Sequence, residues 1–314
     1  MLEAGPKLRP EEFTGREVEM ARRLYTDEGG FLTEDRSMSI AFGRAYGGST
    51  VVYTGTSLTI TEPTVDRWGV PALGRYFTCH PALILVAQHE RPIANYHGHP
   101  KSYYCDHFAG PEGFLLETCM YFPFTTAKSL TGFGAEHARM MSAMDRLQMI
   151  LVLAIDPPEA DNRVMVDAQG RPVVRYRFTE RVRRSLVLAM RASARVFFAA
   201  GAARVHAPAA RQFFIEAADA DRIDELIPFD GLRLGKVTIS SAHPMGGCRM
   251  GAGPSDSVTD AWGRVHGLPW LFVADGSLFP RCAEINPYVT IMALADRVSE
   301  RVRTEWPHLK AIPS

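Results

Sequence analysis

The stretch SSAHPMGGCRMG, residues 240–251, decides how we expect the rest of this chain to be organised. His243 is followed by a proline and a Gly-Gly pair, so its backbone is stiff on one side and bends on the other. About forty residues later, Asp275-Gly276-Ser277 leads to Asn286-Pro287-Tyr288. His243 and Asn286 are polar side chains that can meet over one bound molecule among small and apolar residues, and this composition is typical of a pocket.

Each of these two side chains has a structural and a chemical interpretation. A histidine with a pKa of about 6.5 can accept a proton from an alcohol at neutral pH, but a lone histidine is also a common packed residue. Asn286 can cap the terminal helix, with Pro287 in its first position, or donate its amide to the same oxygen as His243. We expect that helix to bury one apolar stripe, made of Val289, Met292, Ala293, Ala295 and Val298.

The segment before the terminal helix predicts a ligand-binding edge. We expect residues 270–274 to form a strand that ends at Asp275-Gly276. A carboxylate at the carboxyl end of a strand can accept hydrogen bonds from sugar or polyol hydroxyls, and a ribityl chain would suit Asp275. The backbone N–H groups at the start of the terminal helix would stabilise negative charge on a bound ring or phosphate.

The composition is ordinary for a soluble globular protein of 314 residues, which is long enough for one large or two ordinary domains. Its 35 basic and 35 acidic residues cancel, so no overall field attracts nucleic acid or an anionic membrane. The 5 cysteines are odd in number and never spaced as CxxC, which favours a reducing compartment over a disulfide framework. No signal-peptide pattern follows Met1, and the longest apolar run, residues 149–155, is too short to span a bilayer. We therefore expect a cytoplasmic protein.

The middle of the chain, residues 76–237, predicts an antiparallel sheet with helices on one side. Residues 82–87 and 149–155 are short apolar runs that are typical of buried strands. Residues 163–166 and 173–178 predict a hairpin, in which Val174, Tyr176 and Phe178 share one face and Arg175 and Arg177 the other.

Helices are predicted from apolar spacing and capping residues. Thr179 is placed to cap a long amphipathic helix that runs to about Ala200 and stops at Gly201, with Val182, Leu186, Met190 and Phe197 on its apolar side. A surface helix is expected at 11–25, another after the Gly132-Phe133-Gly134 loop, and a short one near 219–226.

Three further stretches leave alternatives open. Gly47-Gly48-Ser49-Thr50 can bring a backbone close to a ligand, with N–H groups pointing at phosphate or carbonyl oxygens, or it can form a Gly-Gly turn between two strands. His97, His99 and Cys105 could share a zinc ion, although histidines on sheet faces are common and no second ligand pair stands at a recognised spacing. The apolar and aromatic segment 114–124 favours a bulky or hydrophobic substrate.

Three motifs together resemble the carboxyl-terminal signature of the glucose–methanol–choline (GMC) family of flavin oxidoreductases: HPMGGCRMG at 243–251, VADGS at 273–277 and NPYVTIMALA at 286–295. The resemblance implies an FAD-dependent enzyme that oxidises the CH–OH group of an alcohol by hydride transfer to flavin N5, with oxygen or another compound as the electron acceptor. It implies that His243 is the catalytic base and that Asn286 assists it.

The same resemblance implies residues that contact FAD. Leu2-Glu3-Ala4-Gly5 is similar to the family's second strand, in which Glu3 would hold the adenosine ribose. The flavin would face the glycine loop formed by Gly47, Gly48, Ser49 and Thr50. Asp275 and Gly276 would contact the ribityl chain or the pyrophosphate, and Pro287 and Tyr288 would lie against the flavin ring. No metal is implied.

The implied fold is of the α/β (α+β) class. Residues 1–75 and 238–314 would form a partial, Rossmann-like FAD-binding domain, and residues 76–237 a substrate domain with an antiparallel sheet flanked by helices. The family's GxGxxG unit should precede Leu2, and a long segment should separate residues 67–71 from residues 73–77. The alternative is a non-catalytic fragment or split subunit, in which a partner chain supplies the GxGxxG unit; a homo-oligomer is also open.

Overall fold

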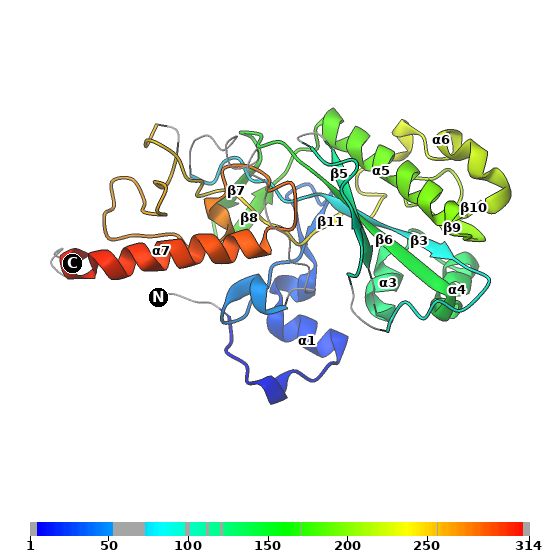
Figure 1. Ribbon diagram of the computed structural model, residues 1–314, viewed down its shortest axis with the longest axis horizontal. Coiled ribbons are helices and arrows are strands. Elements are labelled where there is room, and N and C mark those ends of the chain that lie inside the picture. Colours follow the sequence, from blue (N-terminus) through cyan, green and yellow to red (C-terminus); the bar gives the residue numbers. More distant parts are fainter. Residues whose placement is uncertain are drawn as a thin grey trace.

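Three long antiparallel strands form the centre of the molecule (Figure 1). The computed structural model describes residues 5–52, 73–97, 101–110, 113–119, 122–169, 171–255 and 257–309. Strand β6 (Leu147–Ala154) lies between β3 (Ala82–Gln88) and β5 (Phe114–Cys119). The register pairs Ala82 with Leu153 on one side and Phe114 with Ala154 on the other. The strands predicted at 82–87 and 149–155 are therefore confirmed.

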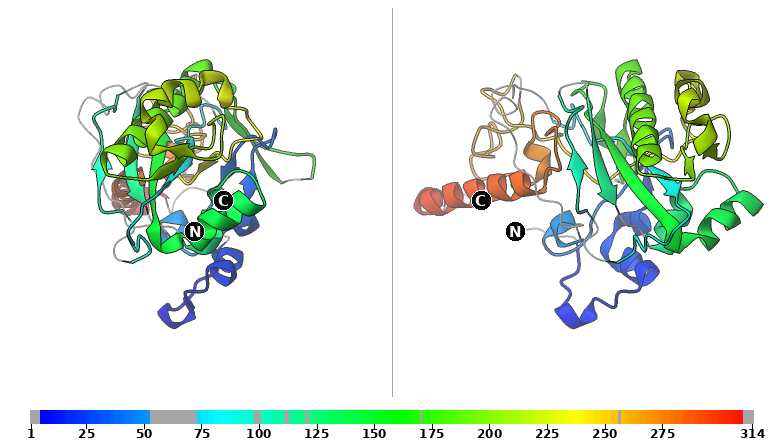
Figure 2. Two further views of the ribbon diagram at one scale, coloured as in Figure 1. Left: turned by 90° about the vertical axis from the view of Figure 1, so that its right-hand side faces the viewer. Right: turned by 45° about the vertical axis from the view of Figure 1, so that its right-hand side comes forward.

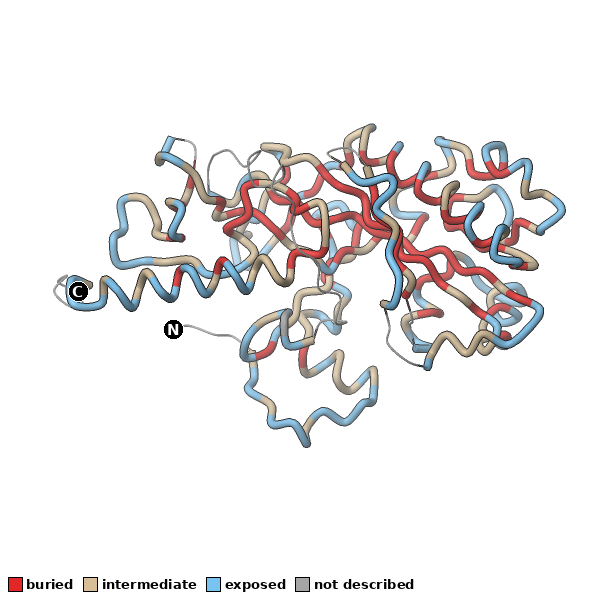
Figure 3. The backbone as a smooth tube through the Cα atoms, in the orientation of Figure 1, coloured by how far each residue is buried: buried red, intermediate tan, exposed pale blue. Residues whose placement is uncertain are grey.

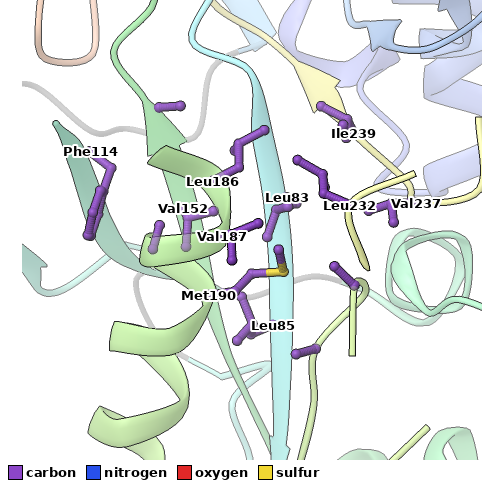
Figure 4. Close-up of a cluster of buried hydrophobic side chains, with 14 of the residues drawn as sticks. Leu83, Leu85, Phe114, Val152, Leu186, Val187, Met190, Leu232, Val237 and Ile239 are labelled. Atoms are coloured by element: carbon purple, nitrogen blue, oxygen red, sulfur yellow. The ribbon is translucent and has the colours of Figure 1, made fainter. Parts of the chain in front are cut away.

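Helices cover both faces of this sheet, so the prediction of helices on one side is wrong. Helix α5 (Glu180–Ala199) covers one face, where Leu186, Val187 and Met190 pack against Leu83 and Leu85 (Figure 4). The short helices α3 (Pro123–Ser129) and α4 (Ala135–Ser142) lie on the other face (Figure 2). The cause is visible in β3 and β6, where residues 82–87 and 149–154 are all apolar, because a strand without polar alternation must be buried on both sides.

Helix α5 matches its prediction closely. The Thr179 hydroxyl accepts a hydrogen bond of 3.3 Å from the Val182 N–H, which satisfies one of the free donors of the first turn. Gly201, with a φ of +83°, follows the last turn in a left-handed conformation that suits glycine. The four residues predicted for its apolar side are all buried: Val182, Leu186, Met190 and Phe197.

The hairpin is also confirmed, as a separate two-stranded sheet of β7 (Arg163–Val166) and β8 (Pro172–Arg175). Val174, Tyr176 and Phe178 are buried, whereas Arg175 and Arg177 are exposed, as the alternation predicts.

Short strands extend the main sheet on both edges. On one edge β11 (Ser240–Ser241) pairs with β3 and, in parallel, with β2 (Ser39–Ile40), which pairs with β1 (Phe31–Leu32). On the other edge β4 (Tyr104–Cys105) pairs with β5. Two more strands, β9 (Arg204–His206) and β10 (Ile215–Glu216), continue from the far end of β3. One sheet thus takes strands from all three predicted domain segments, and the division at 75/76 and 237/238 stays a prediction.

The remaining helices frame the sheet. The N-terminal surface helix α1 (Glu17–Leu24) is shorter than predicted, and α6 (Ile223–Leu226) follows a 3-10 turn. Strand β5 explains the first part of the aromatic segment from 114, because Phe114 and its neighbours are buried within the sheet's two cores, whereas Phe122 and Phe124 are exposed. The described 3-10 helices are Pro10–Glu12, Thr26–Gly29, Gly48–Val52, Met144–Arg146, Ala217–Arg222, Phe229–Gly231 and Gly276–Leu278.

The terminal helix α7 (Tyr288–Leu309) extends away from the sheet and is mostly exposed or half-buried (Figure 3). The predicted stripe is wrong at Met292 and Ala293, which are exposed. Val298 is buried as predicted, together with Leu294, and both pack in one core with Leu278 and Phe279. The predicted strand at 270–274 is also wrong, because only Phe272 makes a β-bridge, to Arg264. Within the described ranges, no helix is both long and apolar enough to cross a membrane.

Candidate active site

A β-bridge outside the main strands builds the centre of the site. Thr78 and Met245 exchange two backbone hydrogen bonds, of 3.0 and 2.8 Å, in an antiparallel bridge. Because the two segments run antiparallel, two residues after Thr78 and two residues before Met245 this register places His80 opposite His243. The two Nδ1 atoms lie 3.0 Å apart, and the rings meet edge to face. Both histidines precede a proline, and the structure joins these two His-Pro pairs across 163 positions of the chain.

Asn286 completes the group from a third segment. Its Nδ2 lies 3.5 Å from His243 Nε2, at the limit of hydrogen-bond distance. The predicted helix cap is corrected here, because the Pro287 carbonyl accepts the first helical hydrogen bond, from Ile291, and the helix begins at Tyr288. Asn286 therefore lies one position before the cap, and its side chain is turned to His243.

One tautomer of His243 fits both contacts when the Asn286 amide is the donor. Nε2 then carries the lone pair that accepts from this amide, and the Nδ1 proton is donated to His80 Nδ1. Burial lowers the pKa of His80 to about 3. Burial, followed by the neighbouring His80 and Lys101, lowers the pKa of His243 well below its usual value. Both rings are neutral at neutral pH, and His243 Nε2 can accept a proton.

His80 is the candidate site residue that the sequence analysis missed. Its side chain is fully buried, and its φ of +49° places a non-glycine residue in the left-handed region, which costs about 1–2 kcal/mol. Strain of this kind at a buried polar residue is typical of functional sites. The available signal was its His-Pro pair directly before an apolar strand, which repeats the His243-Pro244 pair.

The structure brings the Asp275 turn against the 240–251 stretch. The N–H groups of Gly246, Cys248 and Met250 donate to the carbonyls of residues 276, 277 and 278. A Cβ on Gly276 would lie 2.9 Å from the Pro244 carbonyl oxygen, so glycine is required for this close approach. The exposed Asp275 carboxylate accepts hydrogen bonds from the Ser277 N–H and hydroxyl. Its expected contact with a cofactor stays a prediction.

The glycine loop is a turn that enters a 3-10 helix, rather than a turn between two regular strands. Gly47 and Gly48 have φ values of +99° and +66°, and the Gly43 N–H donates to the Ser49 hydroxyl over 2.8 Å. The Thr50 side chain lies outside the described residues, as do the predicted strand at Leu2–Glu3 and the step at residues 67–71.

A buried ion pair lies near the histidines. Lys101 and Glu117 form this pair with side chains that are almost fully buried, and the Lys101 charge is close enough to lower the pKa of His243. Of the predicted zinc ligands, His99 lies outside the described residues. In the part of the chain that is described, no cluster of three or more histidine, cysteine, aspartate or glutamate residues could hold a metal ion.

Comparison with known proteins shows what this chain is similar to in sequence and in fold. Residues 158–295 match the family model of GMC oxidoreductase. An uncharacterized GMC-type oxidoreductase of Mycobacterium tuberculosis is 28% identical over 280 residues, which cover 82% of this chain and 43% of that protein. A long-chain-alcohol oxidase of Arabidopsis thaliana is 32% identical over 139 residues, which cover 41% of this chain and 18% of the oxidase.

Solved structures share the fold. Formate oxidase from Aspergillus oryzae superposes with a TM-score of 0.54 at 12% identity, over 89% of this chain and 60% of the oxidase.

The chain spans 43% of the length of the Mycobacterium tuberculosis relative that it matches.

Proposed function

We propose, from the premise that this chain belongs to the GMC oxidoreductase family, that it carries the alcohol-oxidising site of an FAD-dependent enzyme acting on CH–OH groups. The observation that carries the proposal is the arrangement around His243: a neutral imidazole with Nδ1 against His80 and Nε2 facing the Asn286 amide. A base whose second nitrogen is hydrogen-bonded to an orienting group is the arrangement that proton abstraction from an alcohol requires.

The residues present fit FAD. Asn286 Oδ1 and His80 Nε2 are buried atoms with no hydrogen-bond partner among the described residues, and buried polar atoms of this kind are normally satisfied by a ligand or water. Asn286 lies two residues before the start of the long helix α7, whose free N–H groups favour negative charge. FAD, when bound, supplies at N5 the acceptor for the hydride that leaves the alcohol carbon.

Several segments would hold this cofactor. We assign the flavin ring to Pro287, which is buried, and Tyr288, at the start of α7. The ribityl chain and pyrophosphate are assigned to Asp275 and Gly276, because their turn is hydrogen-bonded to the His243 stretch. The remaining assignments follow the family resemblance and consist of Glu3 for the adenosine ribose and Gly47, Gly48, Ser49 and Thr50 for the flavin.

The chain's own residues would act on the proton. His243 Nε2 takes the hydroxyl proton of the alcohol, while its Nδ1–H remains donated to His80. The Asn286 amide donates to the alcohol oxygen as that oxygen loses its proton. The positive end of α7 stabilises negative charge that develops next to it. An alcohol is the substrate class that this chemistry accepts, and oxygen or another electron acceptor completes the cycle.

The test is anaerobic flavin reduction. Purified chain is titrated with FAD, and bleaching of the flavin spectrum by alcohols is followed for the wild type and for His243→Ala. The variant should bind FAD as the wild type does and be reduced roughly 10²- to 10⁴-fold more slowly. His308→Ala, which changes an exposed histidine of α7, serves as the matched control. Undiminished flavin reduction in His243→Ala would contradict the assignment of His243 as the base. Failure of the wild-type chain to bind FAD would support the need for a partner chain.

A further inference from the structure

A buried carboxylate lies directly behind the histidine pair. Asp156, two residues beyond the end of β6, is 1% exposed. Continuing the β3–β6 register past Ala82 and Leu153 places Asp156 opposite Cys79. The carboxylate accepts hydrogen bonds from the Cys79 N–H and the His80 N–H, both at 3.0 Å. This one side chain therefore holds two consecutive N–H groups of the segment in which His80 has its left-handed φ.

Asp156 is also bonded directly to the segment that carries Asn286, and indirectly to the segment that carries His243. Its carboxylate accepts a 2.9 Å hydrogen bond from the Tyr176 hydroxyl and is hydrogen-bonded to the Cys282 side chain, four residues before Asn286. The path to His243 runs through Ser241, whose hydroxyl donates to the Cys79 carbonyl and accepts from the His243 N–H at 3.1 Å.

The neighbours of Asp156 favour its ionised form by geometry. Two backbone N–H groups, a phenol and a thiol can all donate to the carboxylate, and an ionised carboxylate accepts on both oxygens. A protonated carboxyl would place an O–H among these donors and break at least one of the bonds. Burial opposes the charge and raises the pKa of Asp156 to about 6, while the hydrogen bonds from His80 and Cys79 act in the other direction.

We propose that ionised Asp156 is the positioning residue of this site, which holds His80 so that its Nδ1 orients the imidazole of His243. This inference rests on the proposed function only for its kinetic part. The carboxylate touches neither substrate nor cofactor; it acts by fixing the backbone from which His80 projects. Loss of its charge frees the Cys79–His80 segment to relax out of the left-handed conformation, and the Nδ1 to Nδ1 hydrogen bond is then lost.

Asp156 is the group in this cluster whose pKa lies nearest to neutral pH, because the pKa values of its neighbours are shifted away from that range. Burial raises the pKa values of Cys79, Tyr176 and Cys282 well above their usual values. Burial lowers the pKa values of His80 and His243. A change in the histidine pair between about pH 5 and pH 7 therefore reports the protonation of Asp156.

The test compares the wild type with Asp156→Asn by imidazole ¹⁵N NMR of the purified chain. The wild type should show a hydrogen-bonded Nδ1–H between the two histidines above pH 6, and this signal should be lost on acidification and at every pH in the variant. Alcohol oxidation should fall roughly 10- to 100-fold in kcat, the loss typical when a partner that orients a metal-bound histidine is removed, with little change in KM. Asp230→Asn, at an exposed position, is the matched control.

Each outcome decides the proposal. A folded Asp156→Asn chain that keeps the Nδ1–H signal overturns it. If that variant does not fold, Tyr176→Phe and the pH titration of the wild type replace it, and a signal that is unchanged through pH 6 in both overturns the proposal. Should the wild type show the pH-dependent signal but no reduction of FAD by alcohols, the proposed function fails while the positioning role stands.

Discussion

The core between α5 and the sheet and the site around His243 are held by different forces. Leu83, Leu85 and Val152 are fixed by many weak apolar contacts that are shared among neighbours. His80, His243 and Asn286 are fixed by a few directional hydrogen bonds, each made by one atom. The difference teaches that the core should fail gradually in stability, whereas the site should fail abruptly in function with little change in stability.

The largest expected effect on stability lies in the core. Leu85→Ala removes a fully buried side chain that contacts α5, and the free energy of unfolding should fall by about 2–5 kcal/mol because a cavity remains. Chemical denaturation measures this loss. The His80–His243 Nδ1–H signal of the folded variant should match that of the wild type; a change in that signal would mean that the two regions are not independent.

The second largest effect is a pH dependence of the free energy of unfolding that comes from Asp156, in the site, and not from the apolar core. Burial raises the pKa of Asp156 to about 6 in the folded chain, whereas the unfolded chain keeps about 3.9, so the folded state binds the proton more tightly between these values. Lowering the pH from 7 to 4 should therefore stabilise the wild type relative to Asp156→Asn by about 2 kcal/mol. Denaturant titrations of both chains at each pH give this difference, and a constant difference would contradict the raised pKa.

The smallest effect on stability, with a clear effect on function, is expected at His80. Asparagine tolerates left-handed backbone, so His80→Asn keeps the chain path but removes the ring that orients His243. Alcohol oxidation should fall roughly 10- to 100-fold, while the free energy of unfolding changes by less than about 1 kcal/mol. Stopped-flow flavin reduction and denaturation are compared in the same preparation. If His80→Asn were much less stable than the wild type but reduced flavin at the wild-type rate, His80 would belong with the core and not with the site.

The features that could be predicted from the sequence are those that depend on residues close together in the chain. The cap at Thr179, the alternation at Val174 and Tyr176, and the apolar strand at 82–87 need only local rules, and the structure confirms all three. The start of α7 was predicted one residue too early, at Pro287. Its stripe was wrong at Met292 and Ala293 because the stripe was chosen without knowing what the helix packs against. Residues 270–274 have an apolar pattern but pair by a single bridge.

The site was only half predictable for a physical reason. His243 and Asn286 lie in motifs that carry a family resemblance, so their types and spacing are informative. His80 and Asp156 acquire their roles from registers between segments 163 and 76 positions apart, and no local pattern encodes such a register. A polar residue next to a buried strand is ambiguous until the partner strand is known.

The apolar residues on both faces of β3 have one more consequence, for folding fidelity. A strand that is polar on one face resists a one-residue slip, because the slip would bury its polar side, whereas β3 would bury apolar residues in either alignment. The alignment must then be selected elsewhere, and the nearest selective contacts are those of Asp156 with Cys79 and His80, just ahead of the strand. The hydrogen bonds of Asp156 that we propose to position His80 would then also select the correct register of the sheet. A chain that folds with β3 in the wrong register would lack them and would be inactive.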